Sequence, residues 1–128
     1  RAMLNLWRDA VVREIDTYIL SEPDKFRRLK VLATYAAKPS PDEFGGYRVE
    51  PAMRSWALTD REALAIVNEV DKIRLSLVAK LLSDIGQNEP ALAQLLYGTF
   101  IGLGDLTSKG SANITIALDV LLKLLSEP

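Results

Sequence analysis

Residues 51–86, PAMRSWALTDREALAIVNEVDKIRLSLVAKLLSDIG, predict one long amphipathic helix around which the rest of the chain can be interpreted. Thr59 and Glu62 fit a capping box, in which each side chain accepts the backbone amide hydrogen of the other residue. Apolar residues then recur at three- and four-residue steps, with one arginine on the same face: Leu64, Val67, Val70, Arg74, Leu77, Leu81 and Ile85. Gly86 can adopt the left-handed conformation that ends a helix. A helix over 60–85 would be about 39 Å long and would form the central element of a small all-α domain.

Composition limits the functions that the chain can have. A length of 128 residues is typical of one domain, and 48% apolar residues predict a sizeable core. The net charge of −1 does not suggest a polyanion-binding surface over the whole chain. The chain has no Cys and no His, which removes disulfides, thiolate nucleophiles and the commonest metal ligands, and we expect no cofactor.

Targeting signals are missing from the sequence. No apolar run reaches the length of a membrane span, and the start RAMLNLWRDAV lacks the pattern of a signal peptide. We therefore expect a cytoplasmic protein with no membrane partner, which agrees with the absence of Cys. A helical pattern is already under way at Leu4, so we interpret the chain as a fragment whose natural N-terminus has been removed.

Two helical patterns precede the long helix. The first stripe comprises Leu4, Trp7, Val11, Ile15, Tyr18 and Ile19, and the second comprises Phe26, Leu29, Leu32, Ala33 and Ala36. Between them, Pro23 suits a first helical turn and Asp24 complements the positive end of the helix dipole. The segment KPSPDEFGGYRVE at 38–50 has no period and predicts a loop, and 51–58 can form a short helix.

Two more helical patterns follow Gly86, and both are poor in charge. Asn88 can cap the first of them, and residues 109–111 interrupt the chain before the second. The apolar residues are Leu92, Leu95, Leu96, Phe100, Leu103 and Leu106 in the first helix, and Ile114, Ala117, Leu118, Leu121, Leu122, Leu124 and Leu125 in the second. No strand alternation appears, so the predicted fold is an all-α, orthogonal or antiparallel bundle of about five to six helices.

The charge scarcity of the last two helices has two interpretations. These helices are either central in the core of a monomer, or they form a dimer interface in which two helices from each partner make a four-helix bundle. The second interpretation is slightly favoured, and Gly98 and Gly102 would let a partner helix approach closely. The expected dimerisation residues are Leu92, Leu96, Gly98, Phe100, Leu103, Leu118, Leu121 and Leu125.

Several short motifs resemble a known family. They are Trp56-Ala57-Leu58 before the long helix, Val70-Asp71-Lys72-Ile73-Arg74-Leu75 in its middle, and Leu95-Leu96-Tyr97-Gly98 with Ile101-Gly102-Leu103 on the next helix. Together with the order of elements, they resemble the C-terminal domain of TetR/AcrR-type transcriptional regulators over nearly the whole chain. The helix-turn-helix domain of that family has no counterpart here.

The resemblance implies a cytoplasmic homodimer with a ligand pocket in front of the dimerising helices. An apolar or aromatic small-molecule effector would control DNA affinity, and operator DNA would be bound only through the missing N-terminal domain. The candidate ligand-binding residues are Trp7, Tyr18, Phe26, Tyr35, Trp56, Val67, Val70, Arg74 and Phe100, with Tyr97 as a further wall residue. Seven of them would converge if the long helix packs across the first two helices, with the loop at 38–50 as a lid: Trp7, Tyr18, Phe26, Tyr35, Trp56, Val67 and Val70.

Other interpretations of these residues remain. The same aromatic side chains can close into a solid core without a cavity, and Asp71 and Arg74 can be a simple surface pair rather than a buried anchor. Catalysis is not expected, because Asp42 and Glu43 lie in a loop and Ser108-Lys109-Gly110-Ser111 lacks the strand and glycine spacing of a phosphate loop. The alternative function is a helical protein–protein interaction module without a role in ligand or DNA binding.

Overall fold

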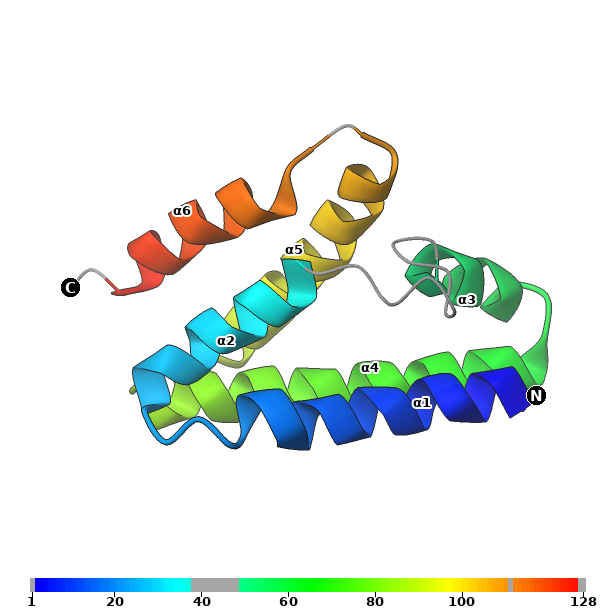
Figure 1. Cartoon of the computed structure of the whole chain (residues 1–128), viewed down its shortest axis with the longest axis horizontal. Coiled ribbons are helices and arrows are strands. Elements are labelled where there is room, and N and C mark those ends of the chain that lie inside the picture. The colour runs from blue at the N-terminus through cyan, green and yellow to red at the C-terminus, as the bar shows by residue number, and fades with distance from the viewer. Residues whose placement is uncertain (1, 38–48, 111, 127–128) are drawn as a thin grey trace.

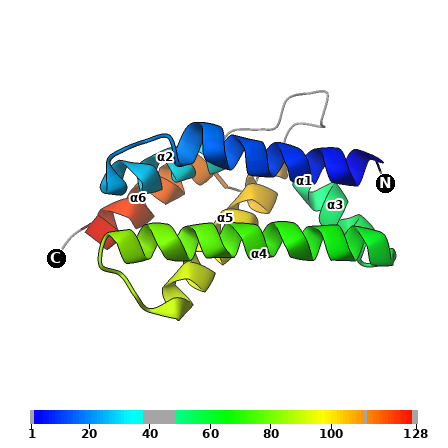
Figure 2. The same cartoon turned by 90° about the horizontal axis from the view of Figure 1, so that it is seen from below.

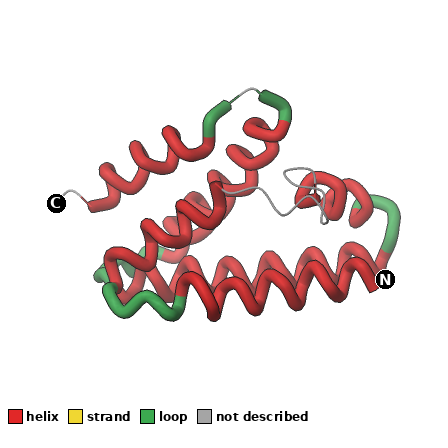
Figure 3. The backbone as a smooth tube through the Cα atoms, in the orientation of Figure 1, coloured by secondary structure: helices red, strands yellow, loops and turns green. Residues whose placement is uncertain are grey.

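Two long helices, α1 and α4, lie side by side and form the base of the molecule (Figures 1 and 2). The computed structural model describes residues 2–37, 49–110 and 112–126. In chain order the elements are α1 (Ala2–Glu14), a π-helical turn η1 (Ile15–Ile19), α2 (Lys25–Ala37), α3 (Val49–Ala57), α4 (Arg61–Asp84), α5 (Pro90–Ser108) and α6 (Ile114–Ser126). Every regular element in the described ranges is helical, which confirms the predicted all-α bundle (Figure 3).

The long helix α4 is confirmed, but its predicted N-cap is wrong by one residue. Asp60, in extended conformation, caps the helix, because its Oδ1 accepts hydrogen bonds from the amides of Glu62 at 2.9 Å and Ala63 at 3.0 Å. The Thr59 hydroxyl instead donates to the carbonyl oxygen of Trp56 at 3.4 Å. A carboxylate also complements the positive end of the helix dipole, which favours Asp60 over its neighbour.

Gly86 ends α4 as predicted. Its φ of 89° is left-handed, the Gly86 amide donates to the Ser83 carbonyl at 3.0 Å, and the Gln87 amide donates to Leu82 at 2.9 Å. This pair of bonds is a Schellman motif, which satisfies carbonyl groups that the helix leaves without partners.

The buried face of α4 follows the predicted stripe with one correction. Val67, Val70, Leu77 and Leu81 are buried, whereas Leu64 is exposed and Ala63 takes its place in the core. One core joins all the helices around this face, and it includes Leu4 of α1, Leu29 of α2, Met53 of α3, Leu96 of α5 and Leu118 of α6.

The π-helical turn at the end of α1 changes the direction of one predicted pocket residue, Tyr18. Its wider turn, closed by a bond from the Leu20 amide to the Ile15 carbonyl at 3.0 Å, advances each residue less around the axis. Ile15 and Ile19 therefore stay buried, whereas Tyr18 is 56% exposed and stacks on Tyr35 at a centroid distance of 6.1 Å.

The start of α2 differs from the prediction, whereas the short helix α3 agrees with it. Asp24 itself caps α2 by accepting from the amides of Phe26 and Arg27, so Pro23 precedes the cap instead of opening the helix. The short helix predicted at 51–58 is confirmed as α3. Most of the predicted loop, 38–48, lies outside the described residues, and so does the proposed lid.

The last two helices use caps that differ in part from the prediction. Glu89 caps α5 by accepting from the Ala91 amide at 3.3 Å, whereas the Asn88 side chain accepts from the Ser83 hydroxyl. Asn113 caps α6 through the Ile116 amide. Among the described residues, no helix combines the length and apolar character that crossing a membrane requires.

Candidate ligand cavity

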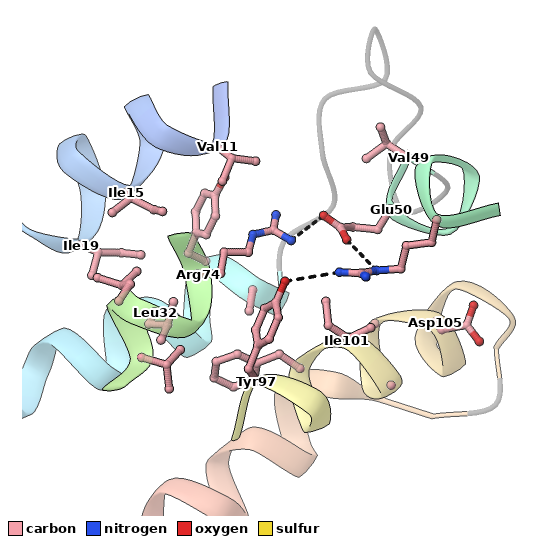
Figure 4. Close-up of a pocket in the computed structure, with 18 of the residues that line it drawn as sticks. Val11, Ile15, Ile19, Leu32, Val49, Glu50, Arg74, Tyr97, Ile101 and Asp105 are labelled. Carbon is pink, nitrogen blue, oxygen red and sulfur yellow. Dashed lines mark hydrogen bonds and ion pairs between the residues drawn. The ribbon is translucent and has the colours of Figure 1, made fainter. Parts of the chain in front are cut away.

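A cavity of about 480 Å³ lies above α4, between α1, α2, α3 and α5 (Figure 4). Most of its wall is apolar and comes from four elements: Val11 of α1, Ile15 and Ile19 of η1, Leu32, Tyr35 and Ala36 of α2, and Leu77 and Val78 of α4. The α5 wall is formed by Tyr97, Phe100, Ile101, Gly102, Gly104 and Asp105, and α3 supplies Val49, Glu50, Pro51 and Arg54. Arg74 of α4 reaches in from below, so the polar groups gather where α3, α4 and α5 meet.

A paired charge network forms this polar end, which we call the charge cluster and define as Glu50, Arg54, Asp71, Arg74 and Tyr97. Arg54 binds Asp71 through both terminal nitrogens, with Nη1–Oδ2 at 3.1 Å and Nη2–Oδ1 at 2.6 Å. The Tyr97 hydroxyl donates to Asp71 Oδ1 at 2.5 Å and accepts from Arg54 Nη2 at 3.3 Å. One residue from each of α3, α4 and α5 is therefore joined in a single network.

A second ion pair crosses from α3 to α4 at the edge of the cavity. Arg74 Nη1 donates to Glu50 Oε1 at 2.7 Å, as the upper dashed line of Figure 4 shows. The other Glu50 oxygen lies 3.4 Å from Arg54 Nε, close enough for an ion pair. Neither of these two atoms has a hydrogen-bond partner, although both are buried. Glu50 and Arg54 therefore attract each other as an ion pair but form no hydrogen bond with each other.

Arg74 also contacts the core on its other side. Its guanidinium carbon lies 5.8 Å from the centroid of the Trp7 ring, within the range of a cation–π interaction. Trp7 is buried on α1, so the interaction links α1 to the cluster. Arg74 and Asp71 are therefore not a simple surface pair, because Arg74 pairs with Glu50 and Asp71 pairs with Arg54.

The surroundings of the cluster shift the pKa values of Asp71, Arg74 and Tyr97. Burial raises the pKa of the Asp71 carboxyl, but the hydrogen bonds from Arg54 and Tyr97 outweigh burial and hold the pKa below its usual value. Burial likewise opposes the charge of Arg74, yet Glu50 and Tyr97 hold its pKa above the ordinary value. For Tyr97, burial is the main cause that raises the pKa of the phenol to about 12, so the hydroxyl stays protonated and can donate.

The predicted ligand-binding residues divide into three groups. Tyr35, Arg74 and Phe100 line the cavity, as does Tyr97. Trp7, Val67 and Val70 are buried, Trp56 is partly buried, and all four pack in or against the core beside the cavity without being among its lining residues. Tyr18 and Phe26 are mainly exposed, and Phe26, at 66%, borders a different hollow near Lys123. The structure therefore places three of the nine predicted residues in the cavity lining and the other six outside it.

The sequence did not identify Glu50 and Arg54 as site residues, nor Arg54 as the partner of Asp71. Glu50 and Arg54 are four residues apart on α3, a spacing that places both on one side of a helix and was a usable signal. Their partners Arg74 and Asp71 lie 24 and 17 residues further along the chain, and no local spacing identifies such pairs.

Within the described ranges, no group of three or more carboxylate, His or Cys side chains is close enough together to hold a metal. Comparison with family models, with curated proteins and with solved structures found no match to this chain.

Proposed function

We propose that this chain is the effector-binding and dimerisation domain of a TetR-like transcriptional regulator. A small molecule would occupy the cavity, and the change would be transmitted to a helix-turn-helix domain that is not among these helices. The observation that carries the proposal is the 480 Å³ cavity with apolar walls and one charged end. Ligand pockets have volumes of roughly 300–1,000 Å³ and combine apolar walls with a few placed polar groups, whereas ordinary protein cores are closely packed.

The position of the cavity offers a route from ligand to interface. The charge cluster connects α3 and α4 to Tyr97 on α5, and Phe100 and Ile101 of the same helix line the cavity. A ligand that changes the position of α5 would shift the geometry of any dimer built on α5 and α6. This is how binding energy at one site alters the equilibrium between two states at another.

Dimerisation is supported by apolar side chains that point out of the bundle. On α5, Leu95 and Leu106 are exposed and lie on one face with Gly98 and Gly102, and on α6 the exposed residues Ile116, Val120 and Leu124 are four apart. A Cβ atom built on Gly98 would meet no atom within 4 Å, so packing inside the chain does not account for this glycine. Gly102 also has open space beside it, but it lines the cavity as well. Both faces fit a helical partner.

The proposed interface differs in part from the residues expected from sequence. Leu96, Phe100 and Leu118 are buried within their own chain and serve its core. Leu92, Leu103, Leu121 and Leu125 are partly buried against that core, and Gly98 is exposed. The dimer face that we propose is therefore Leu95, Gly98, Gly102 and Leu106 with Ile116, Val120 and Leu124, and we call it the outer face.

The same outer face keeps a second function open, a helical module that binds another protein. The two proposals differ in what precedes Arg1 in the full-length protein. A helix-turn-helix with a basic recognition helix encoded upstream would support the regulator. An upstream sequence without such a motif would favour the interaction module.

The ligand proposal is tested by filling the cavity. Small apolar and aromatic molecules are screened by thermal denaturation, and a genuine site gives stabilisation of about 2.7 kcal/mol at a hundred times the dissociation constant. Ala36→Trp places a large ring in the cavity wall and should abolish the response. Ala65→Trp, on the exposed side of α4, is the matched control and should keep it. A broad screen in which no compound shifts the melting temperature contradicts the proposal.

A further inference from the structure

The charges of the cluster at the polar end of the cavity sum to zero. Arg54 and Arg74 contribute two positive charges, and Glu50 and Asp71 contribute two negative charges. Each guanidinium already lies against a carboxylate, at 2.6 Å for Arg54–Asp71 and 2.7 Å for Arg74–Glu50. The remaining charged group of the described lining, Asp105, is at the more exposed edge, where it pairs with Lys109 at 2.8 Å.

A charged ligand would disturb this balance. A carboxylate placed near Arg74 would also lie near Glu50, and the cluster with its ligand would carry an uncompensated negative charge in partly buried surroundings. An ammonium group would meet two guanidiniums and leave the opposite imbalance. In both cases the ligand loses its hydration shell without gaining an unpaired counter-charge.

A neutral hydrogen-bond acceptor avoids that cost. Arg74 lines the cavity with a guanidinium that has five N–H donors and no acceptor, so donors remain even with Glu50 and Tyr97 as neighbours. Three of the four nearby carboxylate oxygens accept hydrogen bonds from Arg54 or Arg74: both oxygens of Asp71, and Oε1 of Glu50. The fourth, Oε2 of Glu50, has no hydrogen-bond partner, but it is buried beside Arg54 Nε and a ligand in the cavity does not reach it. The hydrogen-bonding capacity that a ligand can use at this end is therefore that of a donor, next to walls that are apolar.

We infer that the cavity selects an uncharged, largely apolar molecule that places a carbonyl or ester oxygen against Arg74. This inference rests on the proposed ligand function and specifies the ligand class. The unpaired donor capacity of Arg74 provides orientation, and the apolar walls from α1, η1 and α2 receive the hydrocarbon body.

The test compares head groups on one hydrocarbon body. Methyl octyl ketone, decanoate and decylammonium have ten carbons each and are titrated by calorimetry near neutral pH, below their micelle concentrations. We expect the ketone to bind at least about tenfold more tightly than either ion, because only the ions unbalance the cluster.

A charge variant then isolates the cause. Glu50→Gln keeps the side-chain shape but gives the cluster a net charge of +1, so the ratio of decanoate affinity to ketone affinity should rise by about tenfold or more. Glu69→Gln is the matched control, because that carboxylate pairs with Arg8 and is not among the cavity-lining residues. Circular dichroism establishes that each variant is folded. The head-group comparison in the unmodified chain decides the question by itself if Glu50→Gln is not folded.

The outcomes separate the two proposals. If decanoate or decylammonium binds the unmodified chain as tightly as the ketone, the head-group inference is wrong while the cavity remains a ligand site. If Glu50→Gln is folded and the ratio of decanoate affinity to ketone affinity does not rise, charge balance is not the cause and the inference is also overturned. If none of the probes binds and the wider thermal screen is negative too, the ligand function itself fails.

Discussion

Asp71 is the residue on which three helices depend. It lies in the middle of α4, accepts two bonds from Arg54 of α3, and accepts one from the Tyr97 hydroxyl of α5. About a quarter of its side chain, 26%, remains exposed, so the pairing with Arg54 is only partly shielded from water. Removal of one member leaves the other charge without its partner, which usually costs more than the intact pair contributes.

Asp71→Asn should therefore lower the free energy of unfolding by about 1–3 kcal/mol, measured by urea denaturation at neutral pH. In the unmodified chain, the folded-state pKa of the Asp71 carboxyl is held below the usual 3.8. The contribution of this carboxylate to the free energy of unfolding is therefore present above pH 3.8 and is lost as the pH falls further. The unmodified chain should lose stability over that acidic range more steeply than the variant does. Asp16→Asn, at an exposed position of η1, is the control and should change neither quantity. Equal acid sensitivity of Asp71→Asn and the unmodified chain would contradict this role.

At the scale of the element, the start of α4 is decided between two adjacent candidate N-cap residues. Thr59 and Asp60 are both good N-cap residues, and either could begin the helix. The structure selects Asp60, whose carboxylate accepts two amide hydrogens. The choice moves the helix start by one residue.

Substitution of the two candidates distinguishes them directly. Asp60→Ala should destabilise the protein by about 1 kcal/mol through loss of the cap, whereas Thr59→Ala should have an effect within about 0.5 kcal/mol. Thermal and urea unfolding of both variants provide the measurement. A larger loss in Thr59→Ala than in Asp60→Ala would restore the capping box that the sequence suggests.

Elements were predicted from sequence more successfully than the site. The long helix α4 has a strong period and a left-handed glycine at its end, and both signals are local, so its extent was predicted almost correctly. Tyr18 was misplaced because a π-helical turn rotates it away from the stripe, and the apolar pattern does not indicate where such a turn occurs. Glu50–Arg74 and Arg54–Asp71 depend on how α3 packs on α4, which is a property of tertiary structure.

At the scale of the whole molecule, α4 contacts both the cavity and the core, and α5 connects the cavity to the outer face. Tyr97 and Phe100 of α5 point inward, while Leu95 is 67% exposed on the opposite side. A helix of this kind cannot be altered on its cavity side without some effect on its other side, because protein interiors are densely packed. This arrangement is consistent with the proposal of a ligand-controlled dimer.

The oligomeric state tests the outer face. A stable interface of standard size would bury about 1,600 Å² in total, so the unmodified chain should sediment as a dimer at micromolar concentration. Leu95→Asp and Leu124→Asp place charges on the outer face and should give folded monomers. Leu118→Asp should instead unfold the chain, because Leu118 is only 2% exposed within its own core.

Leu58→Asp is the control for added surface charge. Leu58 is 85% exposed but lies between α3 and α4, away from the outer face, and its substitution should leave the dimer intact. Dissociation by Leu58→Asp, or a monomeric unmodified chain, would show that the interface is not on α5 and α6.

The position of the two tryptophans gives the molecule an optical reporter of its own. Trp7 stacks on the Arg74 guanidinium, and Trp56 lies on α3, the helix that carries Glu50 and Arg54; the chain has no other tryptophan. Indole emission responds to nearby charge and to water, so displacement of Arg74 or α3 alters the emission wavelength and the intensity of the intrinsic fluorescence. Trp56→Phe leaves Trp7 as the single tryptophan fluorophore, beside the cluster. Ligand binding to the unlabelled protein can then be followed in real time by its fluorescence.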